Sequence, residues 1–131
     1  MKHLSRPFQF VSVCLFVLFF AVGCAKKVDP ITALEITILD RTTNKPVAGA
    51  TIELYASYQD WFASTSPTTK AKMTDTNGVL TLTDGADMIV GGTTYYIDAS
   101  KGALDNYAAK ESELKITAAA GQTIKASIVI W

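Results

Sequence analysis

The chain is predicted to fold as an all-β protein, a single seven-stranded antiparallel β-sandwich that follows an N-terminal signal segment. Apolar and polar residues alternate with a period of two in one short segment after another, as they do in strands with one buried face. Segments rich in Gly, Asn, Asp and Pro separate them and are typical of turns. Many short strands joined by such turns indicate two packed sheets.

The expected strands follow one another closely along the chain. In chain order they occupy residues 34–39, 52–56, 70–74, 79–83, 93–100, 114–117 and 124–131. Because alternate side chains of a strand point to opposite faces, we expect Ile52, Leu54, Ile97 and Ile128 to lie in the core. Residues 57–69 and 84–92 are expected to be loops, and residues 105–113 have room for one helical turn at most.

Two connections carry clear turn signals. Pro46 presets a turn, and Gly49 allows the chain to bend tightly into the second strand. In the run Asp75-Thr76-Asn77-Gly78, the aspartate accepts hydrogen bonds from the turn that it opens, and glycine suits a position with positive φ. We interpret these residues as structural, because a calcium site at Asp75 and Asn77 would need further oxygen ligands.

The N-terminal segment has the features of a secretory signal peptide. Lys2, His3 and Arg6 precede an uncharged apolar stretch, which ends in small residues. The end of the stretch, Ala21-Val22-Gly23-Cys24, resembles a bacterial lipobox. That resemblance implies cleavage after Gly23 and acylation of Cys24. The alternative is a transmembrane helix over residues 7–25, a stretch close to the ~20 apolar residues that a bilayer requires.

On this interpretation the chain has three parts. Residues 1–23 are the lipoprotein signal peptide, residues 24–30 are the lipidated cysteine and a polar tether, and residues 31–131 are the β-sandwich. The lipobox resemblance also implies that Ala25, where Asp would mark retention in the inner membrane, favours the outer membrane of a Gram-negative bacterium. The protein would contact the membrane through its lipid anchor.

The composition of the mature chain excludes several functions. Removing Lys2 and Arg6 leaves 10 basic and 12 acidic residues, a net charge of −2, so we expect no nucleic acid as a partner. The only histidine, His3, and Cys14 lie in the signal segment, and Cys24 is the acylation site. Without another His or Cys, a Ser-His-Asp triad, a Cys-His pair or an ordinary zinc site cannot form. We expect no cofactor and no metal.

Three runs of residues resemble a known group of domains. They are Pro46-Val47-Ala48-Gly49-Ala50 at the second strand, Thr74-Asp75-Thr76-Asn77-Gly78 before a middle strand, and Tyr95-Tyr96-Ile97 in a later strand. This order resembles the carboxypeptidase-regulatory-like domains, which are prealbumin-like, or transthyretin-like, sandwiches. The resemblance covers residues 31–131 and implies a Greek-key sandwich. Its motifs are structural and do not identify a function.

The most aromatic part of the mature chain is the candidate binding surface, formed by Tyr58, Trp61 and Phe62. Exposed aromatic rings on a loop would stack against sugar rings or a protein partner. Alternatively, Trp61 and Phe62 fold back and pack against the end of the sandwich. Sequence alone leaves both interpretations open.

These observations favour a lipid-anchored extracytoplasmic module with a non-enzymatic binding or structural role in the cell envelope. Its partner would be an envelope protein or a glycan. The alternative is a small carboxylate-based hydrolase that acts on envelope or extracellular glycans, since such enzymes need two carboxylates across a cleft. The candidate carboxylates are scattered along the chain at Asp84, Asp87, Asp98, Asp105, Glu111 and Glu113.

Overall fold

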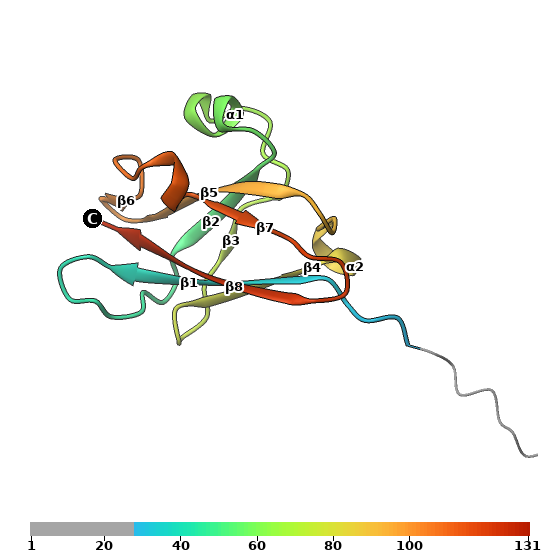
Figure 1. Cartoon of the computed structure of the whole chain (residues 1–131). Coiled ribbons are helices and arrows are strands. Elements are labelled where there is room, and N and C mark those ends of the chain that lie inside the picture. Colours follow the sequence, from blue (N-terminus) through green and yellow to red (C-terminus); the bar gives the residue numbers. More distant parts are fainter. Residues whose placement is uncertain (1–27) are drawn as a thin grey trace, which may run out of the picture.

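The computed structural model describes residues 28–131, so the expected signal peptide and Cys24 lie outside the described residues. In this part of the chain, none of the helices has the length and apolar character needed to cross a membrane. Figure 1 shows the described chain as two layers of strands with a short helix projecting from one end.

Eight strands and three short helices follow one another along residues 28–131. They are β1 (Ala33–Asp40), β2 (Thr51–Tyr55), α1 (Tyr58–Ala63), β3 (Lys72–Met73), β4 (Val79–Thr83), α2 (Asp84–Asp87), β5 (Thr94–Lys101), β6 (Leu104–Asp105), the 3₁₀ helix η1 (Glu111–Glu113), β7 (Lys115–Thr117) and β8 (Thr123–Ile130).

The strands form two sheets, which confirms the predicted β-sandwich. One sheet has the order β4-β1-β8, and the other has the order β3-β2-β5-β6, with β7 also pairing with β5. Two details differ from the prediction. The described part of the chain has eight strands rather than seven, because β6 has only two residues and is too short to show alternation. In addition, β1 and β8 pair in parallel, because the chain enters both strands from the same end.

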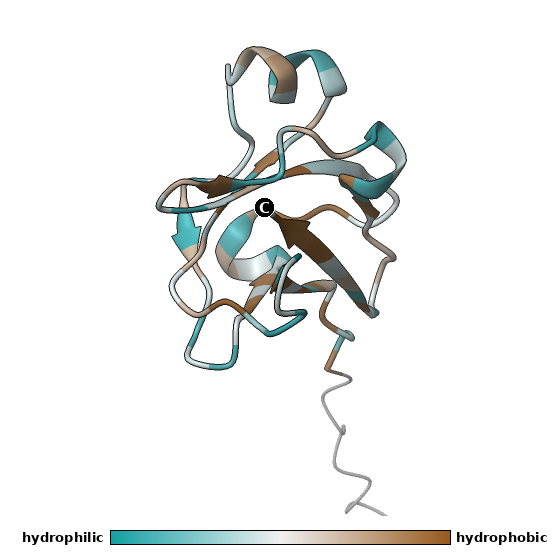
Figure 2. Cartoon of the chain, turned by 90° about the vertical axis from the view of Figure 1, so that its left-hand side faces the viewer, coloured by the Kyte–Doolittle hydropathy of each residue, from teal (hydrophilic) through white to brown (hydrophobic). Residues whose placement is uncertain are grey.

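The core lies between the two sheets, where the predicted period-two faces meet. Ile52, Leu54, Ile97 and Ile128 are at most 3% exposed, which confirms their predicted burial. In Figure 2 the apolar colouring lies mostly on the strands, whereas the connecting loops are largely polar. The alternation in the sequence therefore sets which face of each strand is buried.

Both predicted turns are present. Asp75 Oδ1 accepts hydrogen bonds from the backbone N–H groups of Asn77 and Val79 at 2.8 and 2.9 Å. Gly78 has a φ of 73°, and a Cβ at this position would lie 2.7 Å from the Cβ of Pro46, so a larger residue would be both strained and in collision. Gly49 also has a positive φ, of 65°.

Two segments that were expected to be loops contain short helices. Ser57 caps α1, since its Oγ accepts a hydrogen bond from the N–H of Asp60 at 3.1 Å. Thr83 caps α2 in the same way. These helices were missed because they are too short for a helical period to appear in the sequence. In residues 105–113, where the sequence leaves room for one helical turn, the 3₁₀ helix η1 forms only at the C-terminal end, at Glu111–Glu113.

A buried asparagine completes one edge of β5. This strand pairs with β7 along Thr94–Tyr96 and with β6 at Ser100 and Lys101, which leaves a gap between them. The fully buried side chain of Asn106 fills the gap: its Oδ1 accepts from the N–H of Ala99 at 3.0 Å, and its Nδ2 donates to the carbonyl of Ile97 at 2.8 Å. The amide side chain thus substitutes for a piece of neighbouring strand.

We predict that Asn106→Ala lowers the free energy of unfolding by about 2–4 kcal/mol, because the buried N–H of Ala99 loses its partner and the carbonyl of Ile97 loses one of its two donors. Urea denaturation of the two proteins measures the change. Gln122→Ala, which removes an exposed amide side chain, is the matched control and should be close to neutral. Equal effects of the two substitutions would show that Asn106 does not hold the β5 edge.

Candidate functional site

Five aromatic rings gather at the end of the sandwich where α1 lies. Tyr58 and Trp61 stack with their ring centroids 5.5 Å apart, and Trp61 and Tyr107 stack at 5.1 Å. Phe62 lies 6.3 Å from both Tyr58 and Tyr107. Tyr96 of β5 meets the edge of Tyr58 at 5.9 Å. All three residues of the sequence-predicted surface therefore belong to one cluster.

Trp61 is the buried centre of this cluster, with only 1% of its surface exposed. Its indole N–H donates to the carbonyl of Ile97 at 3.1 Å, and its ring packs in an apolar cluster with Tyr55 and Leu114. Trp61 thus packs against the sandwich end, which was the second of the two interpretations. The exposed-platform interpretation is wrong for this residue, because its polar atom and its ring both have partners inside the protein.

The rings that reach the solvent are those around Trp61. Phe62 is 61% exposed and Tyr107 is 46% exposed, while Tyr58 is half-buried. The hydroxyl of Tyr107 donates to the carbonyl of Phe62 at 2.6 Å, so α1 and the segment after β6 are joined at the surface. We call Tyr58, Phe62 and Tyr107 the aromatic surface. It offers flat apolar faces beside polar groups, which suits contact with a sugar ring or an apolar side chain.

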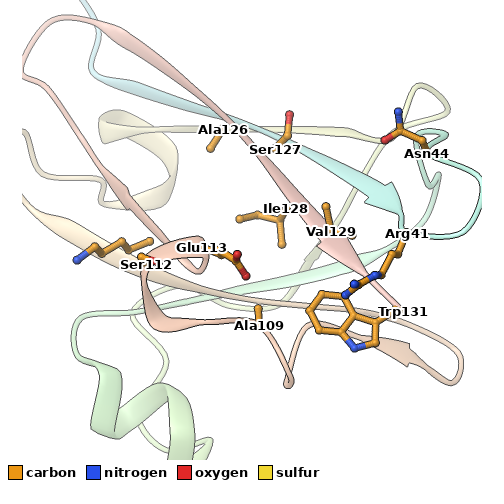
Figure 3. A pocket seen from close by; sticks show the side chains of 11 residues that line it. Arg41, Asn44, Ala109, Ser112, Glu113, Ala126, Ser127, Ile128, Val129 and Trp131 are labelled. Atoms are coloured by element: carbon orange, nitrogen blue, oxygen red, sulfur yellow. The ribbon is translucent and has the colours of Figure 1, made fainter.

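A second feature is a groove of about 620 Å³ along the edge of β8 (Figure 3). One wall is β8, and the other is the segment that leads from β6 through η1 into β7. We call it the β8 groove. Its lining residues are Arg41, Asn44, Ala109, Ser112, Glu113, Lys115, Ala126, Ser127, Ile128, Val129 and Trp131. The groove could not be predicted from the sequence, because three distant segments form it and none carries a local motif.

The charges of the β8 groove are mostly positive. The guanidinium of Arg41 lies over the ring of Trp131, 5.1 Å from its centroid, as Figure 3 shows. Lys115 adds a second cation, and Glu113 is the only carboxylate in the lining. Glu113 also accepts a hydrogen bond from the N–H of Lys110 at 3.1 Å. Within residues 28–131 the ion pairs are Lys72–Asp87 and Lys125–Glu35, so neither cation of the groove is paired there.

The structure does not gather the candidate carboxylates into one site. Asp84 accepts from the N–H of Thr32 at 3.1 Å, and the buried Asp87 pairs with Lys72. Among these residues only Glu113 lines the β8 groove. No group of three or more His, Cys, Asp or Glu side chains in the described part of the chain is placed to hold a metal ion.

Asp98 is the carboxylate with the most unusual surroundings. It lies on β5 directly opposite Glu53 of β2. Partial burial raises the pKa of Asp98, and the negative charges of Glu53 and Asp105 raise it further. A raised pKa beside other carboxylates is also found in acid–base catalysis. None of these three residues lines the β8 groove, however.

Comparison with known proteins identifies the family. Residues 32–129 match the model of the SpaA family, described as a prealbumin-like fold domain. The chain belongs to this family. The prealbumin-like part of the predicted resemblance is therefore confirmed. No curated protein matches the sequence.

Two kinds of solved structure resemble the fold. One is BcpA, the major pilin subunit of Bacillus cereus, at 18% identity and a TM-score of 0.45, where the match covers 77% of this chain and 30% of the pilin. The other is catechol 1,2-dioxygenase from Pseudomonas arvilla C-1, at 12% identity and a TM-score of 0.43, where the match covers 81% of this chain and 54% of the dioxygenase. The chain thus spans about a third of the pilin and about half of the dioxygenase.

We predict that Trp61→Ala lowers the free energy of unfolding by about 3–5 kcal/mol, because it leaves a large cavity at the sandwich end. Phe62→Ala, which shortens the exposed ring next to it, should cost less than about 1 kcal/mol. In a Trp131→Phe background, the emission of Trp61 should be blue-shifted and resistant to quenchers. Red-shifted, easily quenched emission would contradict the burial of Trp61.

Asp98 should make the protein less stable at neutral pH. Because its folded-state pKa is raised, the folded state holds the proton more tightly, and stability falls as pH rises from the ordinary Asp pKa through the raised one. Asp98→Asn should therefore increase the melting temperature at neutral pH and reduce its change between acidic and neutral pH. Asp29→Asn, at an exposed position, is the control. A lower melting temperature of Asp98→Asn at neutral pH would contradict this prediction.

Proposed function

We propose that this protein is a lipid-anchored extracytoplasmic module with a non-enzymatic binding or structural role in the cell envelope. Membership of the SpaA family of prealbumin-like domains supports a structural module, and Ala21-Val22-Gly23-Cys24 supports the anchor. The observation that carries the proposal is the arrangement of the sandwich. The described chain begins at one end of the sandwich, and α1, which carries Tyr58 and Phe62 of the aromatic surface, lies far from this N-terminal end (Figures 1 and 2).

The distance between anchor and domain is short. Val28 follows Cys24 by four residues, and an extended chain spans at most about 3.5 Å per residue, so about 14 Å separate the two at most. A lipid on Cys24 would therefore hold the N-terminal end of the sandwich against the membrane surface. The helix α1 would then point away from the lipid, toward partners in the envelope.

The surface near the tether is suited to that position. Four large apolar side chains are more than half exposed there: Val28, Ile31, Met88 and Val90. The segment with Ile31 and the α2 region are joined, since Asp84 Oδ2 accepts from the N–H of Thr32 and the N–H of Asp84 donates to the carbonyl of Thr32. Apolar side chains beside a lipid anchor favour contact with the bilayer surface.

In this proposal the aromatic surface recognises the partner, an envelope protein or a glycan. The aromatic surface combines three rigid rings with the hydroxyl groups of Tyr58 and Tyr107, a combination that is frequent at binding surfaces. The buried Trp61 holds the rings in place from below. Ala25 after the acylated cysteine favours the outer membrane of a Gram-negative bacterium.

The anchor is tested by Cys24→Ser in cells supplied with labelled palmitate. We expect the wild-type protein to carry the label and to sediment with outer-membrane vesicles in a density gradient. The variant should lose the label, because a serine hydroxyl does not replace the thiol in thioether formation. Palmitate labelling of Cys24→Ser at the wild-type level would overturn the lipoprotein proposal.

Partner capture tests the aromatic surface separately. The tagged mature protein is used to capture an envelope component from detergent-solubilised membranes. We expect Phe62→Ser to abolish co-purification of this component. The melting temperature of the variant should stay nearly unchanged. Met73→Ser, which removes an equally exposed apolar side chain on β3, is the matched control. If both variants capture the same component as the wild type, the aromatic surface is not the recognition site.

A further inference from the structure

The strand β8 has an open edge. In the sheet order β4-β1-β8 it is the last strand, and among the described strands it pairs only with β1, along Thr123–Ile130. Edge strands present unpaired N–H and C=O groups, and these can pair with another chain. In this protein the open edge is also one wall of the β8 groove.

The parallel register shows which backbone groups face outward. Ala33 N–H donates to the carbonyl of Gln122, and Arg41 N–H donates to the carbonyl of Ile130, each at 2.9 Å. Because the direction of the backbone groups alternates along a strand, even-numbered residues of β8 point toward β1. Odd-numbered residues point to the open side, as Trp131 does where it exchanges hydrogen bonds with Asp105.

Three consecutive outward-facing residues, Lys125, Ser127 and Val129, therefore present backbone donors and acceptors beside the groove. No strand of the described residues covers them. The side chain of Lys125 does not cover this edge, because its Nζ forms an ion pair with Oε1 of Glu35 on the face of the sheet, at 2.8 Å. The backbone of this edge is thus accessible over a length that suits a short added strand.

The second wall of the groove limits what can bind there. Ala109, Ser112 and Glu113 stand opposite β8 (Figure 3), so an added strand must lie between two walls. A single extended peptide meets this requirement. A second copy of the domain would bring β1 as a second strand beside its own β8, and two strands need more room beside the opposite wall than a single peptide does.

The charges favour an acidic ligand. Arg41 and Lys115 line the groove without an ion-pair partner in the described part of the chain, and stacking on Trp131 holds the guanidinium of Arg41 in place. The one carboxylate, Glu113, already accepts a backbone hydrogen bond. A carboxylate entering from a ligand would find a planar guanidinium, the group best suited to bind it with two hydrogen bonds.

We propose that the β8 groove binds an extended peptide segment that adds as a strand to the open edge of β8 and places an acidic side chain at Arg41. Main-chain hydrogen bonds to Lys125, Ser127 and Val129 supply the general affinity, and the pairing with Arg41 supplies the preference for acidic sequences. This site differs from the aromatic surface and does not depend on lipid anchoring.

The test uses the isotope-labelled mature protein and a capped heptapeptide of alternating threonine and valine with aspartate in place of the central valine. In NMR spectra the peptide should shift the amides of Lys125, Ser127 and Val129 more than those of Ala126 and Ile128, and it should slow their hydrogen exchange. Replacing the aspartate by asparagine should weaken binding about tenfold, as loss of a charged hydrogen bond does.

Two variants separate the charge from the strand edge. Arg41→Gln should weaken the aspartate peptide about tenfold and leave the asparagine peptide unchanged, whereas Lys45→Gln, an exposed cation outside the groove, should change neither. N-methylation of the amides along one edge of the extended peptide should abolish binding, because these amides pair with β8. N-methylation of the amides along the other edge should be tolerated.

Three results would overturn the proposal. The first is an equal loss of binding when the amides along either edge of the peptide are N-methylated. The second is a set of shifted amides that centres on Phe62 and Tyr107 instead of β8. The third is slow exchange of Lys125, Ser127 and Val129 that increases with protein concentration in the absence of peptide, which would assign the edge to a second copy of the chain.

Discussion

The carbonyl of Ile97 holds together the end of the sandwich that carries α1 and the aromatic surface. It accepts a hydrogen bond from the side chain of Asn106 and another from the indole of Trp61. The first holds the segment after β6 against the edge of β5, and the second holds α1 above the same strand. Both donors are buried, so neither bond can be exchanged for one with water without opening the structure.

The segment between β6 and β7 consequently contributes residues to both the aromatic surface and the β8 groove. On one side Tyr107 completes the aromatic surface, and on the other side Glu113 and Ser112 form a wall of the β8 groove. Ala109 lines the groove and also packs against the cluster around Trp61. Any change that moves this segment would alter both surfaces, although they face different ligands.

The sequence predicted most of the sandwich, because period-two alternation directly reports the buried face of a strand. It predicted the Asp75–Gly78 turn for a similar reason, since the required backbone geometry restricts the residue types. It did not predict β6, which is too short to alternate, or the direction of β8, which depends on the path of the whole chain. Asn106 also escaped notice, because an asparagine in a polar stretch is typical of a loop.

The candidate site was predicted only in part. The aromatic cluster was visible because Tyr58, Trp61 and Phe62 are neighbours in the sequence, but which rings are exposed depends on Ile97 and Tyr107, which are far away along the chain. The β8 groove left no local signal, because Arg41, Glu113 and Trp131 come together only when the two sheets pack. Long-range packing therefore decides the parts of the site that the sequence left open.

The parallel pairing of β1 with β8 has a consequence for how the protein is made. Ala33 pairs with Thr123 and Asp40 pairs with Ile130, so β1 can pair with β4 as soon as residues 79–83 have been synthesised but gains its second neighbour only after β8 has been made. Contacts between such distant residues form late and slowly. Until β8 has been synthesised, the edge of β1 opposite β4 therefore stays unpaired, and an unpaired strand edge on an emerging chain can pair with other chains.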